Sequence, residues 1–174
     1  MTEERLVPDL SQFHGLIVIV HVLGVLLFAL AHGVSAAVLL RIRSERDPAA
    51  LRTLLDLSRR SVNVMSVGYL VWFLSGILAG FSGNWWTTGR LWIWASLIIA
   101  IAITAVMTPM GRFYLNRVRT ALGVDEKTGR YDPSAQVDPA ALEAAIASGQ
   151  PTLVAAIGIM GLAVIAWLMM AKPF

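Results

Sequence analysis

The sequence predicts an all-α polytopic membrane protein, a bundle of four transmembrane helices with short amphipathic helices on its cytoplasmic side. Of 174 residues, 57% are hydrophobic and only 14% are charged, whereas about a quarter of a soluble domain is charged. Four apolar segments are each long enough to cross a hydrocarbon core, for which about 20 helical residues suffice. We therefore expect residues 1–174 to form a single membrane domain.

The four spans are expected at about residues 13–40, 61–81, 91–110 and 151–170, and none of them contains Asp, Glu, Lys or Arg. Backbone N–H groups in lipid must find acceptors within the same segment, which favours helices. The alternation with period two that is typical of membrane β-strands is missing.

The basic residues predict the orientation, because Lys and Arg near span ends stay in the cytoplasm. Only Arg5, Arg90 and Lys172 lie on the side of the termini. This asymmetry predicts a multi-pass protein of the bacterial cytoplasmic (inner) membrane with both termini on the outer side. The other eleven lie between spans one and two or between spans three and four: Arg41, Arg43, Arg46, Arg52, Arg59, Arg60, Arg112, Arg117, Arg119, Lys127 and Arg130.

Tryptophans are expected to anchor the bundle at the outer interface, where an indole buries its ring and keeps its N–H hydrated. These interface anchors are Trp85, Trp86, Trp92, Trp94 and Trp167.

Two short helices are expected in the cytoplasmic loops. The word Asp-Pro-Ala-Ala-Leu occurs at residues 47–51 and again at 138–142, and Asp is a favoured N-cap, with Pro favoured at the first helical position. In the first loop, leucines and charged residues share the stretch up to Arg60, which predicts an amphipathic helix. Gly149 and Pro151 are expected to end the second helix.

Glycine pairs mark the expected helix-packing positions, because small residues let backbones approach closely in lipid. Gly76 and Gly80 form such a pair in span two, while Gly158 and Gly161 lie on span four. These contacts are expected either within the bundle or between protomers.

All three histidines, His14, His21 and His32, lie on the first span. Steps of seven and eleven residues return within about 20° of one direction on a helix, so the three form one stripe. Because polar side chains inside a span usually face the bundle interior, we expect His21 and His32 to point inward. His14 is expected near the outer boundary.

Three roles stay open for His21 and His32. Neutral imidazole is a ligand of haem b and of copper, and an imidazole can also simply hydrogen-bond across the bundle. One helix cannot supply both axial ligands of one iron, so a second ligand would be a methionine, a partner's histidine, or absent. The candidate methionines are Met65, Met107, Met110 and Met160. The candidate hydrogen-bond partners are backbone carbonyls across the bundle and the side chains of Asn63, Ser66, Ser75, Thr104 and Thr108.

A resemblance covers about residues 14–123. The run His21-Val22-Leu23-Gly24, followed by Ala31-His32-Gly33, Arg46-Asp47-Pro48 and the segment 54–59 (LLDLSR), resembles a bacterial family of predicted integral membrane proteins of unknown function. The resemblance implies a four-span protein of the cytoplasmic membrane without an assigned activity.

The His-Val-Leu-Gly word at residues 21–24 is also similar to the first helix of two other families. These are the copper resistance protein D family and the four-helix haem-binding protoporphyrinogen oxidase family. The second similarity implies that His21 serves haem. The lysine that this oxidase family has at the start of its third helix is not matched, and Arg90 stands near that place instead.

The function expected from these observations is that of a small accessory or complex-forming inner-membrane component whose activity is unassigned, with a non-enzymatic role favoured over an enzymatic one. Its expected partners are the lipid bilayer and other membrane subunits or a second copy. Nucleic acid is not expected as a partner, because the basic residues lie where membrane topology requires them. The alternatives are a haem b redox protein or enzyme subunit, with His21 as leading ligand and His32 next, and copper handling. The chain has no Cys, which excludes thiolate ligands for any metal.

Overall fold

The computed structural model describes residues 10–86, 90–124, 131–132 and 135–173, and these are helical apart from short connections. Four helical segments are long and apolar enough to cross a membrane. The prediction of an all-α bundle of four transmembrane helices is therefore confirmed. In chain order the elements are a 3-10 turn (Ser11–Phe13), α1 (His14–Ser44), α2 (Pro48–Ser82), α3 (Leu91–Ala121), α4 (Pro139–Ala147) and α5 (Pro151–Ala171).

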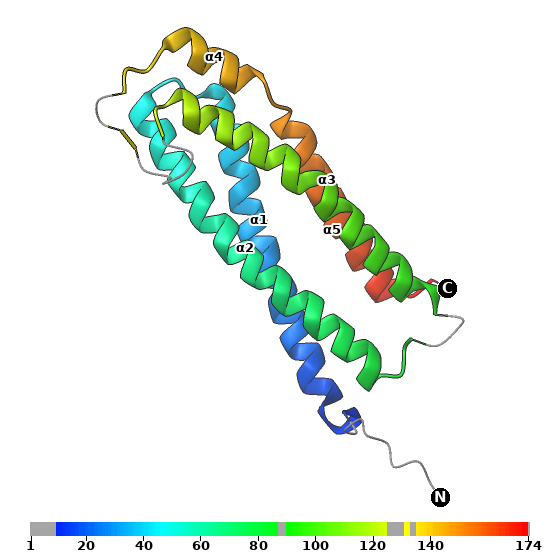
Figure 1. The fold of residues 1–174 in the computed structure, drawn as a ribbon. Coiled ribbons are helices and arrows are strands. Elements are labelled where there is room, and N and C mark those ends of the chain that lie inside the picture. The colour runs from blue at the N-terminus through cyan, green and yellow to red at the C-terminus, as the bar shows by residue number, and fades with distance from the viewer. Residues whose placement is uncertain (1–9, 87–89, 125–130, 133–134, 174) are drawn as a thin grey trace, which may run out of the picture.

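The helices form two antiparallel pairs. Helices α1 and α2 pack against each other over much of their length, and α3 packs against α5 (Figure 1). The two pairs meet mainly through α1 and α5, whereas α2 and α3 make only a small contact. Helix α4 crosses one end of the bundle (Figure 1).

The closest approach within the bundle lies between α1 and α2, where two glycines face each other's helix. A Cβ atom built on Gly24 would lie 2.6 Å from the backbone nitrogen of Trp72, and one on Gly68 would lie 2.7 Å from that of Phe28. On each helix a glycine precedes a large aromatic residue by four positions, Gly24 and Phe28 on α1 and Gly68 and Trp72 on α2. Each glycine contacts the backbone of the aromatic residue on the other helix. This reciprocal contact brings the two backbones together, as small residues do in membrane helices.

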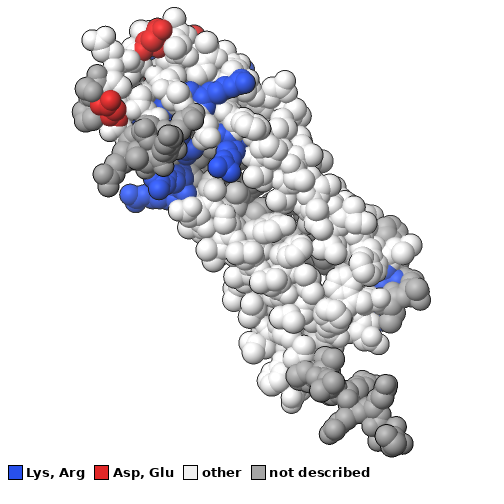
Figure 2. Space-filling view, viewed as in Figure 1, with Lys and Arg blue, Asp and Glu red and all other residues white. Residues whose placement is uncertain are grey.

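The apolar core lies at the end of the bundle that α4 crosses. We call it the arginine end, because the last turns of α1, the α1–α2 connection and the first turns of α2 carry Arg41, Arg43, Arg46, Arg52 and Arg59. Figure 2 shows most of the charged side chains of the visible face gathered there, with a basic side chain near the opposite end and a wide uncharged surface between them. An ion pair between Arg46 Nε and Glu143, at 2.6 Å, ties the α1–α2 connection to α4. The buried core residues are Val38, Leu39, Ile42, Leu51, Leu55, Tyr114, Leu115, Val118, Leu122, Leu142, Ala145, Ile146 and Val154.

The opposite end, which we call the aromatic end, holds the start of α1, the α2–α3 connection and the end of α5. Indole rings gather here, with centroids 5.6 Å apart for Trp85 and Trp92 and 5.1 Å apart for Trp86 and Trp94. Trp92 is buried in the bundle, while Trp94 and Trp167 are exposed. The predicted anchors thus divide into a packed cluster and two outward-facing rings.

Both predicted helix starts are confirmed, but the separate helix predicted in the first loop is wrong. The Asp47 carboxylate accepts from the N–H groups of Ala49 (3.3 Å) and Ala50 (3.0 Å), and Asp138 accepts from Ala140 (2.9 Å). After Asp47, however, α2 runs unbroken to Ser82. The sequence between Leu57 and Ser61 has no Gly or Pro to end a helix. In the second loop, α4 is a separate helix and ends before Gly149, as predicted.

Candidate functional site

A cavity of about 610 Å³ lies in the middle of the bundle and is lined by residues of α1, α2, α3 and α5. This volume is in the range of cofactor and drug-sized ligand sites. The lining is apolar and aromatic apart from two histidines and a few hydroxyl groups. Leu26, Leu70 and Met170 belong to the lining and are also exposed, so the cavity opens sideways, and within a membrane it would be reached from the lipid.

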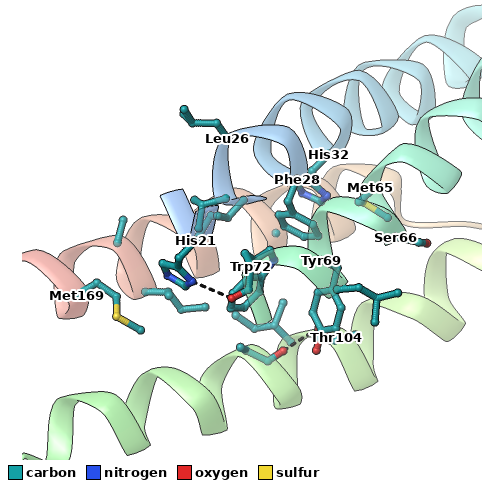
Figure 3. A pocket seen from close by; sticks show the side chains of 18 of the residues that line it. His21, Leu26, Phe28, His32, Met65, Ser66, Tyr69, Trp72, Thr104 and Met169 are labelled. Atoms are coloured by element: carbon teal, nitrogen blue, oxygen red, sulfur yellow. Dashed lines mark hydrogen bonds between the residues drawn. The ribbon is translucent and has the colours of Figure 1, made fainter. Parts of the chain in front are cut away.

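His21 is oriented by a hydrogen bond to the main chain of α2. Its Nδ1 lies 2.8 Å from the carbonyl oxygen of Trp72 (Figure 3). A carbonyl oxygen can only accept, so Nδ1 must carry the proton, and Nε2 is the nitrogen with a free lone pair. A backbone carbonyl on the other ring nitrogen is the usual support of a metal-binding histidine, because it fixes the tautomer and the ring orientation.

Gly76 provides the space for the His21 ring. A Cβ atom on Gly76 would lie 2.9 Å from Cε1 and 3.1 Å from Nδ1 of His21. This glycine was predicted as a position of helix packing, and the structure places it under an imidazole. His21 also lines a second cavity of about 290 Å³ toward the aromatic end, so it stands between the two spaces.

His32 is buried, and its Nε2 has no hydrogen-bond partner among the described residues. Its ring stacks on Phe28 with an interplanar angle of 4° and centroids 5.7 Å apart (Figure 3). A Cβ atom on Gly158 would clash with Nε2, and it would lie 2.8 Å from the methyl carbon of Met107. The His32 imidazole therefore occupies the space left by Gly158, beside Met107, at the wall of the larger cavity.

His14, the third member of the stripe, lies outside the two cavities. Its Nδ1 is 2.8 Å from the hydroxyl oxygen of Ser82, and its ring packs edge-on against Trp85. Three residues of one stripe thus have three different surroundings: His14 a hydroxyl group, His21 a carbonyl and a cavity, and His32 a buried position without a partner.

Three of the hydroxyl groups predicted as histidine partners bond to their own helices instead. Ser66 donates to Val62, Ser75 to Val71 and Thr104 to Ala100. Each of these bonds joins a side chain to the carbonyl four residues earlier, which is the usual way for Ser and Thr to satisfy a hydroxyl in a helix. The interpretation of the stripe as imidazoles that hydrogen-bond across the bundle is therefore confirmed for His14, which meets the Ser82 hydroxyl, and for His21, which meets the Trp72 carbonyl. It is not confirmed for His32, whose Nε2 has no partner among the described residues.

The four candidate methionines lie in different parts of the bundle, and two of them line the larger cavity. Met65 and Met107 line the larger cavity. Met110 packs against the core of the arginine end, and Met160 is 62% exposed on the outside of α5. Met169, which the sequence analysis did not single out as a ligand, lines both cavities together with His21.

The other predicted glycines also face large side chains. A Cβ atom on Gly80 would lie 2.5 Å from Cε2 of Trp86, and one on Gly161 would clash with the side chain of Ile103. The contacts of these glycines lie within the chain. The glycines that bring backbones together, Gly24 and Gly68, were not predicted as a pair, because nothing in one helix shows which residue of another helix will face it.

Several buried polar side-chain atoms in the described part of the bundle have no hydrogen-bond partner. Six buried side-chain nitrogen or oxygen atoms lack a hydrogen-bond partner within the described part of the chain. Three of them belong to residues that line the two cavities, namely Nε2 of His32 and the indole Nε1 atoms of Trp72 and Trp86. The other three belong to Arg52, Ser58 and Tyr114. Buried polar groups are nearly always satisfied in native proteins, and a molecule or water bound in the cavities would supply partners for the three atoms of His32, Trp72 and Trp86.

Comparison of the chain with family models, with curated proteins and with solved structures gives no match. The family resemblances therefore stay predictions.

Proposed function

We propose that this chain is a haem b-binding membrane protein in which His21 is an axial ligand of the iron. One observation carries the proposal: a neutral imidazole, held through Nδ1 by the carbonyl of Trp72, forms part of the wall of a lipid-accessible cavity of about 610 Å³. Haem b is a large, planar and mostly apolar cofactor that accepts imidazole as its axial ligand. When bound, it supplies reversible one-electron chemistry.

The lining of the cavity fits the apolar body of such a cofactor. Aromatic side chains of α1 and α2 contact one another here, with ring centroids 6.1 Å apart for Phe28 and Trp72 and 5.3 Å apart for Tyr69 and Trp72. Met65, Met107 and Met169 offer thioether sulfurs in the same lining, and a thioether is an established second axial ligand of haem iron. The apolar wall would lower the local polarity around such a cofactor and exclude water from it, which is one way a protein tunes a haem's reduction potential.

His21 is the leading ligand rather than His32, since the two imidazoles are held differently. His21 has its Nδ1 proton bonded, which leaves Nε2 outside that hydrogen bond. Nε2 of His32 is enclosed against Gly158 and Met107. The two residues are eleven positions apart on one helix, about 16 Å of rise, so they would not share one iron.

The test is an absorption spectrum of the protein purified in mild detergent from cells with ample haem, recorded oxidised and then reduced with dithionite. The expected result is a stoichiometric Soret band with α and β bands on reduction. His21→Ala should lose or strongly shift this spectrum. His14→Ala is the matched control, because His14 lies on the same stripe but bonds to Ser82. A colourless wild-type protein, or a His21→Ala variant with an unchanged spectrum, would contradict the proposal.

We propose further that the protein lies in the bacterial cytoplasmic membrane with the aromatic end on the outer side, since the basic residues concentrate at the arginine end. The absence of cysteine makes single-cysteine labelling direct. Asn84→Cys at the aromatic end should react with a membrane-impermeant thiol reagent in intact cells, whereas Ser44→Cys at the arginine end should react only after lysis. The reverse pattern would refute the orientation.

Copper handling and an accessory role in a larger membrane complex stay predictions. The described residues contain no group of three or more His, Asp or Glu residues that could hold a metal ion, so the structure adds no support for a copper site. For the accessory role, the structure offers no particular surface that identifies a partner.

A further inference from the structure

Beyond the cavity that His21 lines, Lys172 at the aromatic end lies in an unusual setting. Lys172 lines the smaller cavity of about 290 Å³, which shares His21, Trp72 and Met169 with the larger one. The lysine follows Met169 by three residues, about one helical turn. The two cavities together therefore run from the middle of the bundle to a basic side chain at its aromatic end.

Two indole rings hold the ammonium group of Lys172. Its Nζ lies 5.1 Å from the ring centroid of Trp85 and 5.4 Å from that of Trp92. Both distances are within the range in which an aromatic face attracts a cation. Trp92 is buried and Trp85 packs against the edge of His14, so the rings themselves are fixed by their surroundings.

No carboxylate neutralises this cation within the described part of the chain. The ion pairs there, Arg41 with Glu45 and Arg46 with Glu143, both lie at the arginine end, and neither cavity has Asp or Glu in its lining. An ammonium group that is positioned by aromatic rings, at the end of an apolar cavity and without a counter-ion, is suited to bind the acidic group of an amphiphilic ligand.

We propose that Lys172, positioned by Trp85 and Trp92, binds the propionate carboxylates of the bound cofactor and so fixes which edge of the macrocycle faces the aromatic end. This inference rests on the proposed haem function. Haem b carries both of its acidic groups on one edge, while the rest of its periphery is apolar. The cavities show the same division, with apolar walls around His21 and a single cation at one end.

The test is a set of Soret titrations of the haem-free protein in neutral detergent with haem b and with its dimethyl ester, which has the same macrocycle but no carboxylate charge. Lys172→Met should weaken binding of haem b by about five-fold, the size of a partly exposed ion pair, and leave binding of the ester unchanged. Arg90→Met is the matched control, because Arg90 is an exposed basic residue of the same end that lines neither cavity. It should bind both compounds like the wild type.

The outcomes separate this inference from the proposed function. If wild-type protein binds neither compound, the haem proposal fails and this one fails with it. If haem binds and depends on His21, but Lys172→Met has no effect or weakens haem and ester equally, the haem proposal stands and the role of Lys172 is refuted.

Discussion

Replacing Gly24 by Ala tests the contact that holds α1 against α2. The new methyl group would lie 2.6 Å from the backbone nitrogen of Trp72 and 3.0 Å from its Cα. Ordinary contacts between such atoms are about 3.5–4.0 Å long, so the helices must separate by about 1 Å or tilt. Backbone atoms cannot rotate away as a side chain can. We expect Gly24→Ala to destabilise the protein by about 1–3 kcal/mol, the cost of overpacking a well-packed interior.

The control for this variant lies on the same helix. A Cβ atom on Gly33 would meet nothing within 4 Å, and Gly33 is exposed. Ala is a better helix former than Gly by about 0.5–1 kcal/mol, so Gly33→Ala should stabilise the protein slightly. The two variants make the same chemical change, and their free energies of unfolding should differ by about 2–4 kcal/mol.

The assay is unfolding in mixed micelles with increasing SDS, followed by tryptophan fluorescence and by far-ultraviolet circular dichroism. Trp72 lies at the contact itself, so its fluorescence should report the separation of α1 from α2. If Gly24→Ala is as stable as Gly33→Ala, the close approach of the two backbones is not a feature of the folded protein, and the arrangement of the α1–α2 pair is refuted.

Three further predictions follow from individual contacts. Gly76→Ala places a methyl group 2.9 Å from the His21 ring and should lower haem affinity about ten-fold, as loss of ligand support does; unchanged Soret titrations would contradict this. Asp47→Ala removes the N-cap of α2 and should cost about 1 kcal/mol in SDS unfolding, while Asp47→Asn, which still caps, should cost little. The N–H groups of Asp47 and Arg46 donate to Glu45 and hold the pKa of its carboxyl below the usual value. The ionised Glu45 carboxylate therefore stabilises the fold at pH values above the pKa it has in the unfolded chain, and this stabilisation is lost as the pH falls through the lowered pKa of the folded protein. Glu45→Gln should therefore reduce the dependence of stability on pH in acid, and an unchanged dependence would contradict this.

Much of the fold follows from the sequence, because each apolar segment must satisfy its own backbone in lipid. The four segments, the two Asp caps and helix α4 could all be predicted in this way. The lengths of the helices could not. Helix α3 continues to Ala121, past Pro109 and the expected end at residue 110, and α2 begins at Pro48 rather than at residue 61. Charged residues show where a segment would leave the hydrocarbon, but they do not end a helix.

For the candidate site, the sequence predicts where the histidines lie on α1 but not what surrounds them. The spacing of His14, His21 and His32 gives one stripe from helical geometry alone. What each imidazole meets depends on residues far away in the sequence: Ser82 for His14, Trp72 for His21 and Gly158 for His32. Lys172 and Met169 carried no local signal of a site, since a lysine and a methionine near the end of a span are ordinary.

The distribution of packing suggests how stability and ligand binding divide along the bundle. The buried core lies at the arginine end, and the reciprocal contact of Gly24 and Gly68 joins α1 to α2. The cavities lie where glycines make room for side chains, with Gly76 beside His21 and Gly158 beside His32. Ligand sites usually lie in the less densely packed and less stable parts of a protein. Substitutions in the core of the arginine end should therefore lower stability in detergent, whereas substitutions around the cavities should change ligand affinity at a smaller cost in stability. Glycine serves both purposes, close backbone packing and space for a side chain at the cavity. Which of the two a given glycine serves depends on its neighbours on the opposing helix.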